Sequence, residues 1–115
     1  MYSLNVSQVK ALNLPGRKVK VLVGNEKLLS KYMSVGITEL PPHKEMIPHT
    51  HKEEEEIIIV IQGYGKVKVG DSVEKLEPNT AVVFPKGKSH MVINESNEVM
   101  KFIFCFSPCH DFGKL

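Results

Sequence analysis

The hydrophobic positions of the chain come in short runs separated by turn-forming residues. Runs rich in Val, Ile and Phe are broken at close intervals by Gly, Pro and Asn, as at Pro15-Gly16, Gly63-Tyr64-Gly65 and Pro85-Lys86-Gly87. No stretch of helical length keeps an uninterrupted 3.6-residue period, and the best helical candidate is the short segment 7–12. Many short strands with frequent turn signals predict an all-β sandwich or barrel.

The boundaries of the expected strands follow from these turns. Gly70-Asp71 is a two-residue loop of a type that joins hairpin strands, and Gly36 is expected to mark a β-bulge. The strands are expected at residues 18–23, 32–40, 46–51, 56–62, 65–69, 72–76, 81–84, 89–94 and 99–106. We expect an N-terminal arm with one or two strands over residues 1–30, the barrel over residues 31–110 and a C-terminal tail over residues 111–115.

The expected strand at 56–62 is apolar on both faces. Ile57, Ile59 and Ile61 alternate with Ile58 and Val60. A strand of this kind is covered on both sides, so one face should line the barrel interior. The other face should meet a second sheet layer or a partner subunit, which makes a homodimer the expected assembly.

Composition and charge exclude several classes of protein. The 115 residues, 42% hydrophobic and 24% charged, predict one globular domain. The net charge is +2 and the lysines are scattered, so nothing indicates nucleic-acid binding. No apolar run reaches the ~18 residues of a membrane helix, and the N-terminus lacks the features of a signal peptide. We therefore expect a cytoplasmic protein without a membrane partner. Cys105 and Cys109 do not make a disulfide framework.

Four residues have types and spacings that suit a metal site. On a strand, His49 and His51 would share a face. Glu56 lies an odd number of residues beyond His51, but the polar segment 52–55 is expected to be a connection, so the next strand can present Glu56 inward. His90 follows the turn at 85–88 and completes the set.

The segments around these residues resemble the two motifs of the cupin family. His49-Thr50-His51-Lys52-Glu53-Glu54-Glu55-Glu56, followed by six residues and Gly63, is similar to the first motif. Pro85-Lys86-Gly87-Lys88-Ser89-His90-Met91-Val92-Ile93-Asn94 is similar to the second. The resemblance covers about residues 33–106 and implies a small RmlC-like cupin with a jelly-roll barrel (double-stranded β-helix). It implies that His49, His51, Glu56 and His90 bind one divalent ion, with Glu55 as the alternative to Glu56.

Two positions depart from the family pattern. The family usually has Gly six residues before the first His and six residues before the Pro of the second motif, where this chain has His43 and Asn79. Asn tolerates left-handed backbone better than most residues, so that turn can survive. The departures concern two turns and leave the ligand positions intact.

The ligand set and the resemblance limit the chemistry without fixing a reaction. Three imidazoles and a carboxylate suit Mn, Fe, Co, Ni or Zn, and octahedral coordination would leave two positions open. Cupins include dioxygenases, decarboxylases, isomerases, lyases and sugar-binding sensors. We expect a metal-dependent enzyme acting on a small oxygenated molecule; the alternatives are a non-catalytic module that binds a sugar or organic acid, and an ion that mainly stabilises the fold.

An enzyme that transfers protons needs an acid or base near the metal, whereas a binding module does not. The candidates for that role are Tyr32, Tyr64 and Cys105. The residues interpreted as solvent-facing are His43, Glu53, Glu54 and His110.

Overall fold

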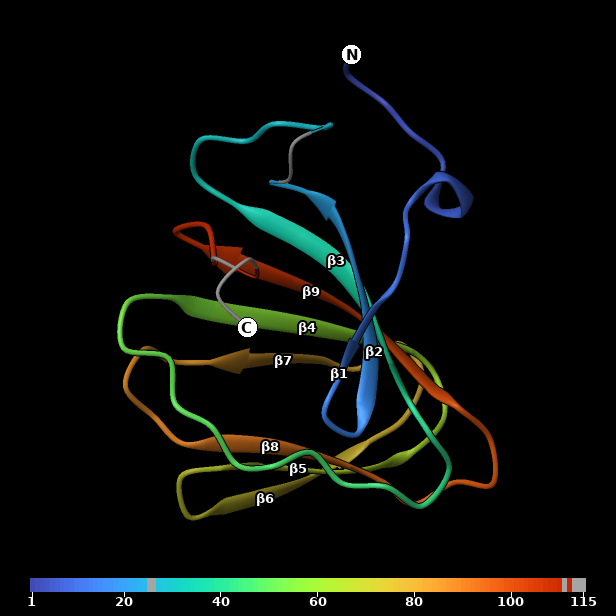
Figure 1. Cartoon of the computed structure of the whole chain (residues 1–115). Coiled ribbons are helices and arrows are strands. Elements are labelled where there is room, and N and C mark those ends of the chain that lie inside the picture. The colour runs from blue at the N-terminus through green and yellow to red at the C-terminus, as the bar shows by residue number, and fades with distance from the viewer. Residues whose placement is uncertain (25–26, 111, 113–115) are drawn as a thin grey trace.

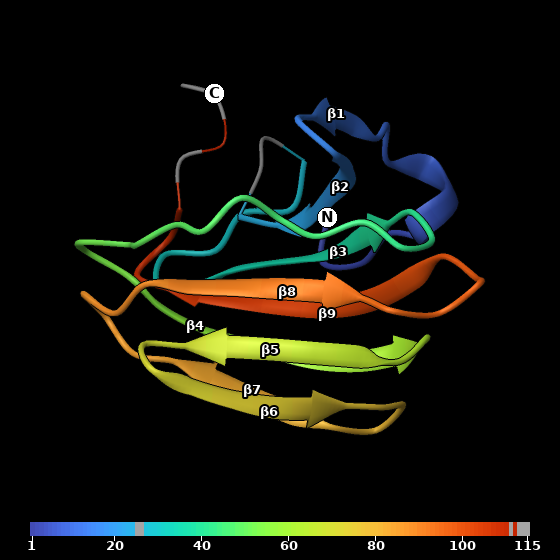
Figure 2. The same ribbon diagram turned by 90° about the horizontal axis from the view of Figure 1, so that it is seen from below.

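Two antiparallel sheets make up the fold in the computed structural model, which describes residues 1–24, 27–110 and 112. The large sheet has the strand order β1-β2-β3-β9-β4-β7, and the small sheet has the order β6-β5-β8. The strands are β1 (Leu12–Leu14), β2 (Arg17–Val23), β3 (Ser34–Leu40), β4 (Glu55–Gln62), β5 (Gly65–Val69), β6 (Ser72–Leu76), β7 (Ala81–Phe84), β8 (His90–Asn94) and β9 (Met100–Ser107). The sheets face each other, with β8, β5 and β6 opposite the large sheet (Figures 1 and 2). The prediction of an all-β jelly-roll barrel is confirmed.

Most strands lie within a residue or two of their expected positions, but segment 46–51 is not a strand. It makes one isolated bridge to β8, His49 with His90, and a second one, Glu45 with Ile93, lies just before the segment. Pro48 has no N–H to offer a continuous ladder. The chain therefore runs beside β8 as an irregular connection, held by reciprocal backbone bonds between His49 and His90 of 3.0 and 2.9 Å.

Two further local expectations are corrected. The segment expected to be helical contains only a 3-10 turn at Val6–Gln8, and β1 begins at Leu12. The β-bulge lies in β2, between Val21 and Val23, while Gly36 pairs regularly with Val21. Gly36 is needed for a different reason: a side chain there would overlap the Lys20 carbonyl and the ring of Phe104.

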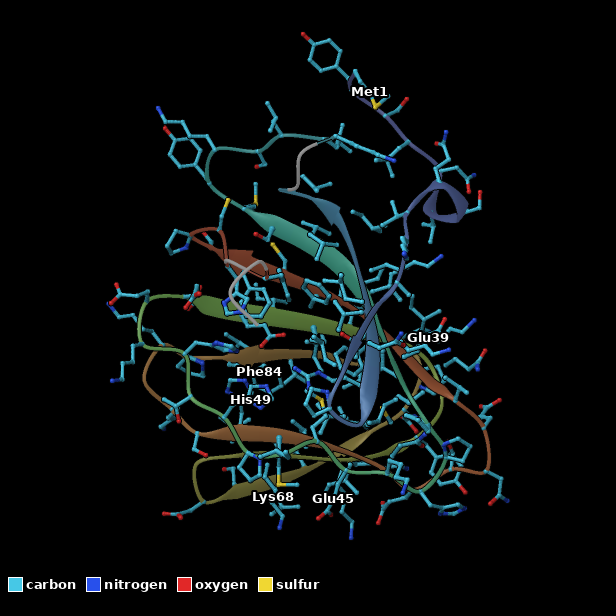
Figure 3. The ribbon with its side chains drawn as sticks, in the orientation of Figure 1. Met1, Glu39, Glu45, His49, Lys68 and Phe84 are labelled. Carbon is cyan, nitrogen blue, oxygen red and sulfur yellow. The ribbon has the colours of Figure 1, made fainter. Side chains whose placement is uncertain are left out.

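The core fills the space between the sheets. Phe102, Phe104 and Phe106 all point inward from β9 and are buried. His49 and Phe84 lie between the sheets, whereas Glu45 and Lys68 lie at the outer side of the small sheet (Figure 3). On β4, Ile58 and Val60 are fully buried as expected, alternating with outward residues of the same strand.

The outward face of β4 is apolar and exposed. Ile57, Ile59 and Ile61 are 43–47% exposed, and Val83 on the adjacent β7 is 51% exposed. The sequence led us to expect either a second sheet layer or a partner subunit over this face. No sheet layer from the described part of the chain lies over it.

Both positions that depart from the family pattern have left-handed backbone. Among the described residues, His43 (φ 57°) and Asn79 (φ 71°) are the non-glycine residues with positive φ. The turns thus keep the conformation for which glycine is favoured. His43 is exposed and its imidazole hydrogen-bonds to Asn97 Oδ1 at 2.6 Å, so its interpretation as a surface histidine is confirmed.

The first 30 residues contribute β1 and β2 to the large sheet. The division into arm, barrel and tail stays a prediction, and positions 111 and 113–115 of the tail lie outside the described residues. No helix in the described ranges is long and apolar enough to cross a membrane.

Candidate metal centre

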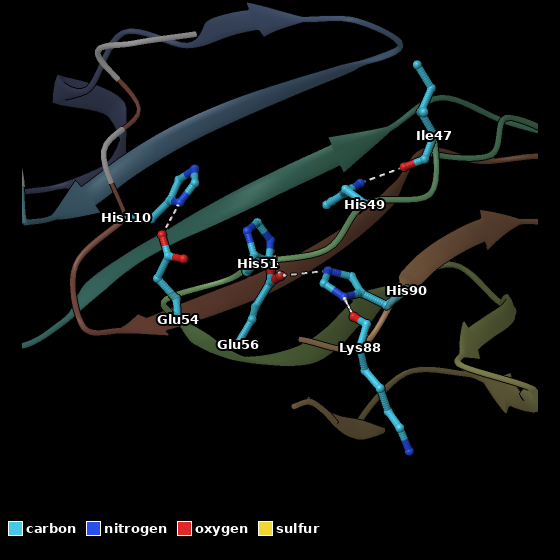
Figure 4. Close-up of polar contacts among 8 residues, drawn as sticks. All are labelled: Ile47, His49, His51, Glu54, Glu56, Lys88, His90 and His110. Atoms are coloured by element: carbon cyan, nitrogen blue, oxygen red, sulfur yellow. Dashed lines mark hydrogen bonds and ion pairs between the residues drawn. The ribbon is translucent and has the colours of Figure 1, made fainter. Parts of the chain in front are cut away.

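Three histidines and a glutamate converge between the two sheets. His49 and His51 come from the connection before β4, Glu56 from β4 and His90 from the start of β8. One nitrogen from each of the three histidines lies within 4.8 Å of the others. Glu56 Oε1 lies 3.4 Å from the Nε2 atoms of both His51 and His90 (Figure 4). The structure thus brings together the four residues that the sequence singled out.

Hydrogen bonds orient two of the imidazoles. The Nδ1 atom of His49 donates to the Ile47 carbonyl at 2.5 Å, and that of His90 donates to the Lys88 carbonyl at 3.1 Å (Figure 4). Each bond fixes the tautomer that leaves Nε2 unprotonated, which is the usual arrangement around a metal-binding histidine. The rings are therefore oriented to direct their free nitrogens inward.

Two buried nitrogens in the cluster, the Nε2 atoms of His51 and His90, have no hydrogen-bond partner among the described residues. Buried polar atoms nearly always have a hydrogen-bond partner, and an atom without one calls for an explanation such as a bound ion. Together with the facing carboxylate, these nitrogens form a donor set that fits a divalent transition metal.

Aromatic neighbours hold the rings in place. Phe84 stacks on His90 with the ring centroids 4.1 Å apart, and the edge of His51 meets Phe106 at 4.9 Å. These apolar contacts restrict the side chains and lower the local dielectric around the cluster. A site built this way needs little rearrangement to receive an ion.

The electrostatics favour the metal-binding protonation states. Burial raises the pKa of Glu56, but the facing imidazoles of His51 and His90 outweigh it and hold the pKa below its ordinary value. Burial lowers the pKa of His49, and the neighbouring charges of His90, Arg17 and His51 add to this, against the bond to Ile47. Glu56 is thus a carboxylate and His49 a neutral imidazole near pH 7, the forms that bind metals.

The alternative carboxylate, Glu55, faces the other way. Glu55 is exposed on the outer side of β4, whereas Glu56 is 6% exposed and points inward. The burial supports Glu56 over Glu55. The assignment of His49, His51, Glu56 and His90 as ligands stays a prediction.

Three residues of the cluster, His49, His51 and Glu56, line a cavity of about 290 Å³. This volume is at the lower end of the range for small-molecule sites. Eight of the fourteen lining residues are apolar and six are polar or charged. The lining residues are Pro15, Arg17, Val19, Thr38, Met46, Ile47, His49, His51, Glu56, Phe102, Phe104, Phe106, His110 and Phe112.

A second polar pair lies beside the cluster, and its interpretation as solvent-facing was wrong. His110 Nδ1 is 2.6 Å from Glu54 Oε1, and the two side chains are only 20% and 12% exposed (Figure 4). The His110 ring stacks on Phe106 at 4.7 Å and lies 5.2 Å from the ring of His51. The signal was present in the sequence only as an unassigned histidine near the C-terminus.

Arg17 also reaches the cavity, and sequence reasoning missed it.

The three residues suggested as an acid or base do not line the cavity. Tyr32 and Tyr64 are 64% and 52% exposed, and Cys105 pairs between Val35 and Ile57 on the outward side of the large sheet. The polar groups near the cluster therefore come from other parts of the chain.

Comparison with known proteins identifies the family. A family model described as a cupin domain matches residues 36–106, while no curated protein sequence gives a significant match. The fold is similar to the structure of KdgF from Halomonas sp. (20% identity, TM-score 0.80, covering 100% of this chain and 98% of that one). It is also similar to an RmlC-like cupin from Shewanella frigidimarina (16%, 0.80, 99% and 95%).

A further similar structure is a predicted oxalate decarboxylase from Thermotoga maritima (20% identity, TM-score 0.75, covering 92% of this chain and 98% of that one). At these identities the likeness shows the fold alone. The family match, by contrast, spans more than half of the chain and includes both histidine-bearing segments. The chain therefore belongs to the cupin family.

Proposed function

We propose that this cupin is a mononuclear metal-dependent enzyme acting on a small oxygenated molecule. The observation that carries the proposal is the convergence of inward-facing imidazole nitrogens and the Glu56 carboxylate beside a cavity between the two sheets. His49, His51, Glu56 and His90 would hold one Mn, Fe, Co, Ni or Zn ion. When bound, the ion would supply Lewis-acid polarisation of substrate oxygens.

The residues of the chain supply the rest of the environment. The apolar walls from β2 and β9 offer hydrophobic contacts, and the volume suits a small molecule. The bonds to Ile47 and Lys88 keep His49 and His90 in one orientation, so that substrate binding need not reorganise the site.

The pair of His110 and Glu54 favours an enzyme over a binding module. An enzyme that transfers protons needs an acid or base within reach of the metal, and His110 lines the same cavity beside His51. The Glu54 carboxylate accepts a hydrogen bond from Nδ1–H of His110. This leaves Nε2 of His110 as the atom that can take or give a proton. A module that only captures a sugar or organic acid would not need this pair.

The reaction class stays open among oxidation by dioxygen, decarboxylation, isomerisation and elimination. The description of the Thermotoga maritima protein as a predicted oxalate decarboxylase belongs to that protein. It is compatible with a small acid as ligand and does not select a reaction. A cytoplasmic location also stays a prediction.

We also propose a homodimer formed through the outward face of β4. The register places Ile59 next to Ile103 and Ile103 next to Ile37, so an apolar row crosses three strands. Ile57 continues a second row with Val83. A contiguous apolar sheet face of this kind is unusual on a monomer. A second copy would present the same rows and cover it symmetrically.

The metal content of the protein tests the proposed site. Protein purified without an affinity tag should contain close to one equivalent of a transition metal by elemental mass spectrometry. The double variant His49→Ala, His90→Ala should contain almost none, because it loses two of four donors. His43→Asn is the control, since it removes an exposed histidine and keeps a residue that tolerates positive φ. Parent protein that stays metal-free after exposure to each candidate ion would refute the proposal.

A further inference from the structure

The sole arginine of the chain lines the cavity that holds the metal cluster. Arg17 is the first residue of β2, directly after the Pro15-Gly16 turn. Alternate residues of a strand share a face, and Val19, two positions on, is buried in the core. Arg17 is therefore on the inward side of β2, and it lines the cavity together with His49 and Glu56.

The guanidinium is half-buried and has few partners. Its one hydrogen bond within the described part of the chain is donated by Nη1 to the Pro15 carbonyl at 3.2 Å. Burial lowers the pKa of Arg17, and the negative charge of Glu56 opposes this without cancelling it. A guanidinium has five N–H donors, so most of its capacity is unused.

The balance of charge in the cavity changes when a metal binds. Arg17 and Glu56 are the only Lys, Arg, Asp or Glu side chains in the described cavity lining. A divalent ion on the histidines would be partly neutralised by Glu56, which would no longer serve as a counter-charge for Arg17. The loaded cavity would then hold an excess of positive charge, and buried charge is stable only when it is paired.

We propose that Arg17 is the specificity-determining residue of this site and that it selects a small carboxylate as ligand. This inference rests on the proposed metal function. One carboxylate oxygen can accept from the guanidinium while the remaining oxygens face the metal cluster. The planar fork of Arg matches a carboxylate, and the apolar cavity walls suit a short hydrocarbon chain. Phosphate would use the same charge, but it is a strongly hydrated dianion without a hydrocarbon part to contact the apolar walls.

The position of Arg17 does not need a guanidinium for folding. Leu14 pairs with Arg17 through the backbone across Pro15-Gly16. Gly16 has φ 74°, which is the conformation required at the third position of a type II turn that has Pro before it. The turn is thus determined by Pro15 and Gly16, and a different side chain at position 17 should preserve it.

Calorimetric titration of the metal-loaded protein with pyruvate tests the inference, with pyruvamide as the uncharged analogue of equal size. Arg17→Gln should weaken pyruvate binding roughly ten- to hundredfold, the effect of losing a charge-assisted bond, and should leave pyruvamide binding unchanged. Arg17→Lys should keep part of the affinity. Lys18→Gln is the matched control: it removes the same charge from the neighbouring, exposed position of β2 and should have no effect.

Several results would overturn the inference while the metal site stands. These are equal pyruvate affinity in the parent and Arg17→Gln, an equal loss in Lys18→Gln, tighter binding of inorganic phosphate than of pyruvate, or no binding of pyruvate or malonate at millimolar concentration. If circular dichroism shows that Arg17→Gln does not fold, the pyruvate affinity of Arg17→Lys is the test instead, and an affinity equal to that of the parent would overturn the inference. If the protein takes up no metal, the proposed function is refuted. The same titrations on metal-free protein then test whether Arg17 binds the carboxylate without a metal.

Discussion

Replacing Asn94, the last residue of the second motif, should cost more stability than replacing a residue of the metal cluster. The Asn94 side chain is 1% exposed, and its hydrogen bonds join it to residues outside the cluster. Its Nδ2 group donates to the carbonyls of Leu40, Pro41 and Glu98 at 3.0, 3.0 and 2.8 Å. Its Oδ1 accepts from the backbone N–H and the hydroxyl of Ser96 at 2.9 and 2.6 Å.

The magnitude follows from the partners left behind. Each net hydrogen bond contributes about 1 kcal/mol, and a buried group left unsatisfied costs about 1–3 kcal/mol. Asn94→Ala strips partners from three carbonyls and from Ser96, some of which water will reach. We therefore expect a loss of roughly 3–5 kcal/mol, a large fraction of the ~5–15 kcal/mol typical of small domains.

Urea unfolding of metal-free protein, followed by circular dichroism, measures this loss without a contribution from bound metal. Asn94→Asp is the informative companion, because it keeps the shape and the acceptor for Ser96 but turns a donor toward three carbonyls into another acceptor. It should be at least as destabilising as Asn94→Ala near neutral pH. A loss below about 1 kcal/mol in both variants would show that the network contributes little and would refute the reasoning.

Three other predictions concern the dimer, a turn and the pH dependence of metal binding. Ile59→Glu should convert the dimer to a monomer in light scattering, while Ser72→Glu, an exposed position on the small sheet, should not; a parent that is already monomeric would contradict the proposed interface. Asn79→Ala should lower the free energy of unfolding by about 1 kcal/mol because alanine is disfavoured at positive φ, and Asn79→Gly should change it little; equal stability of the alanine variant and the parent in urea would refute this. Because burial lowers the pKa of His49, its imidazole should stay neutral to a lower pH than a free histidine. Co²⁺ affinity should be full near pH 7 and fall as protons compete below the ordinary histidine range, about 6.5; affinity that does not change down to about pH 5 would argue against histidine ligands.

The fold could be predicted from the sequence because its signals are local. Glycine and proline mark the strand ends, and the period-two alternation on β4 correctly assigns Ile58 and Val60 to the interior. The expected strand at 46–51 failed because alternation cannot show whether a segment finds a continuous partner. There, Pro48 and the path of the chain beside β8 leave only isolated bridges.

The metal cluster was predictable from two short motifs, and its surroundings were not. His49, His51 and Glu56 lie within one short stretch, and the resemblance of a later segment to the second cupin motif adds His90. Arg17 and His110 lie near opposite ends of the chain. Only the packing of β2 and of the segment after β9 around the cavity places them beside the cluster, and no local pattern encodes that arrangement.

This difference in origin has a consequence for how the two parts of the site respond to substitution. The connection that carries His49 and His51 is held at its start by the Asn94 bonds to Leu40 and Pro41 and further along by the bridge between His49 and His90. Arg17 and His110 instead lie on the second strand from the edge of the large sheet and on the segment beyond β9. The Arg17 guanidinium donates one hydrogen bond within the described part of the chain, to the Pro15 carbonyl of its own turn, so changes at Arg17 should alter which ligand is bound while the barrel and the metal donors persist. Variants at Arg17 should therefore report on ligand recognition, whereas variants around Asn94 should report on stability.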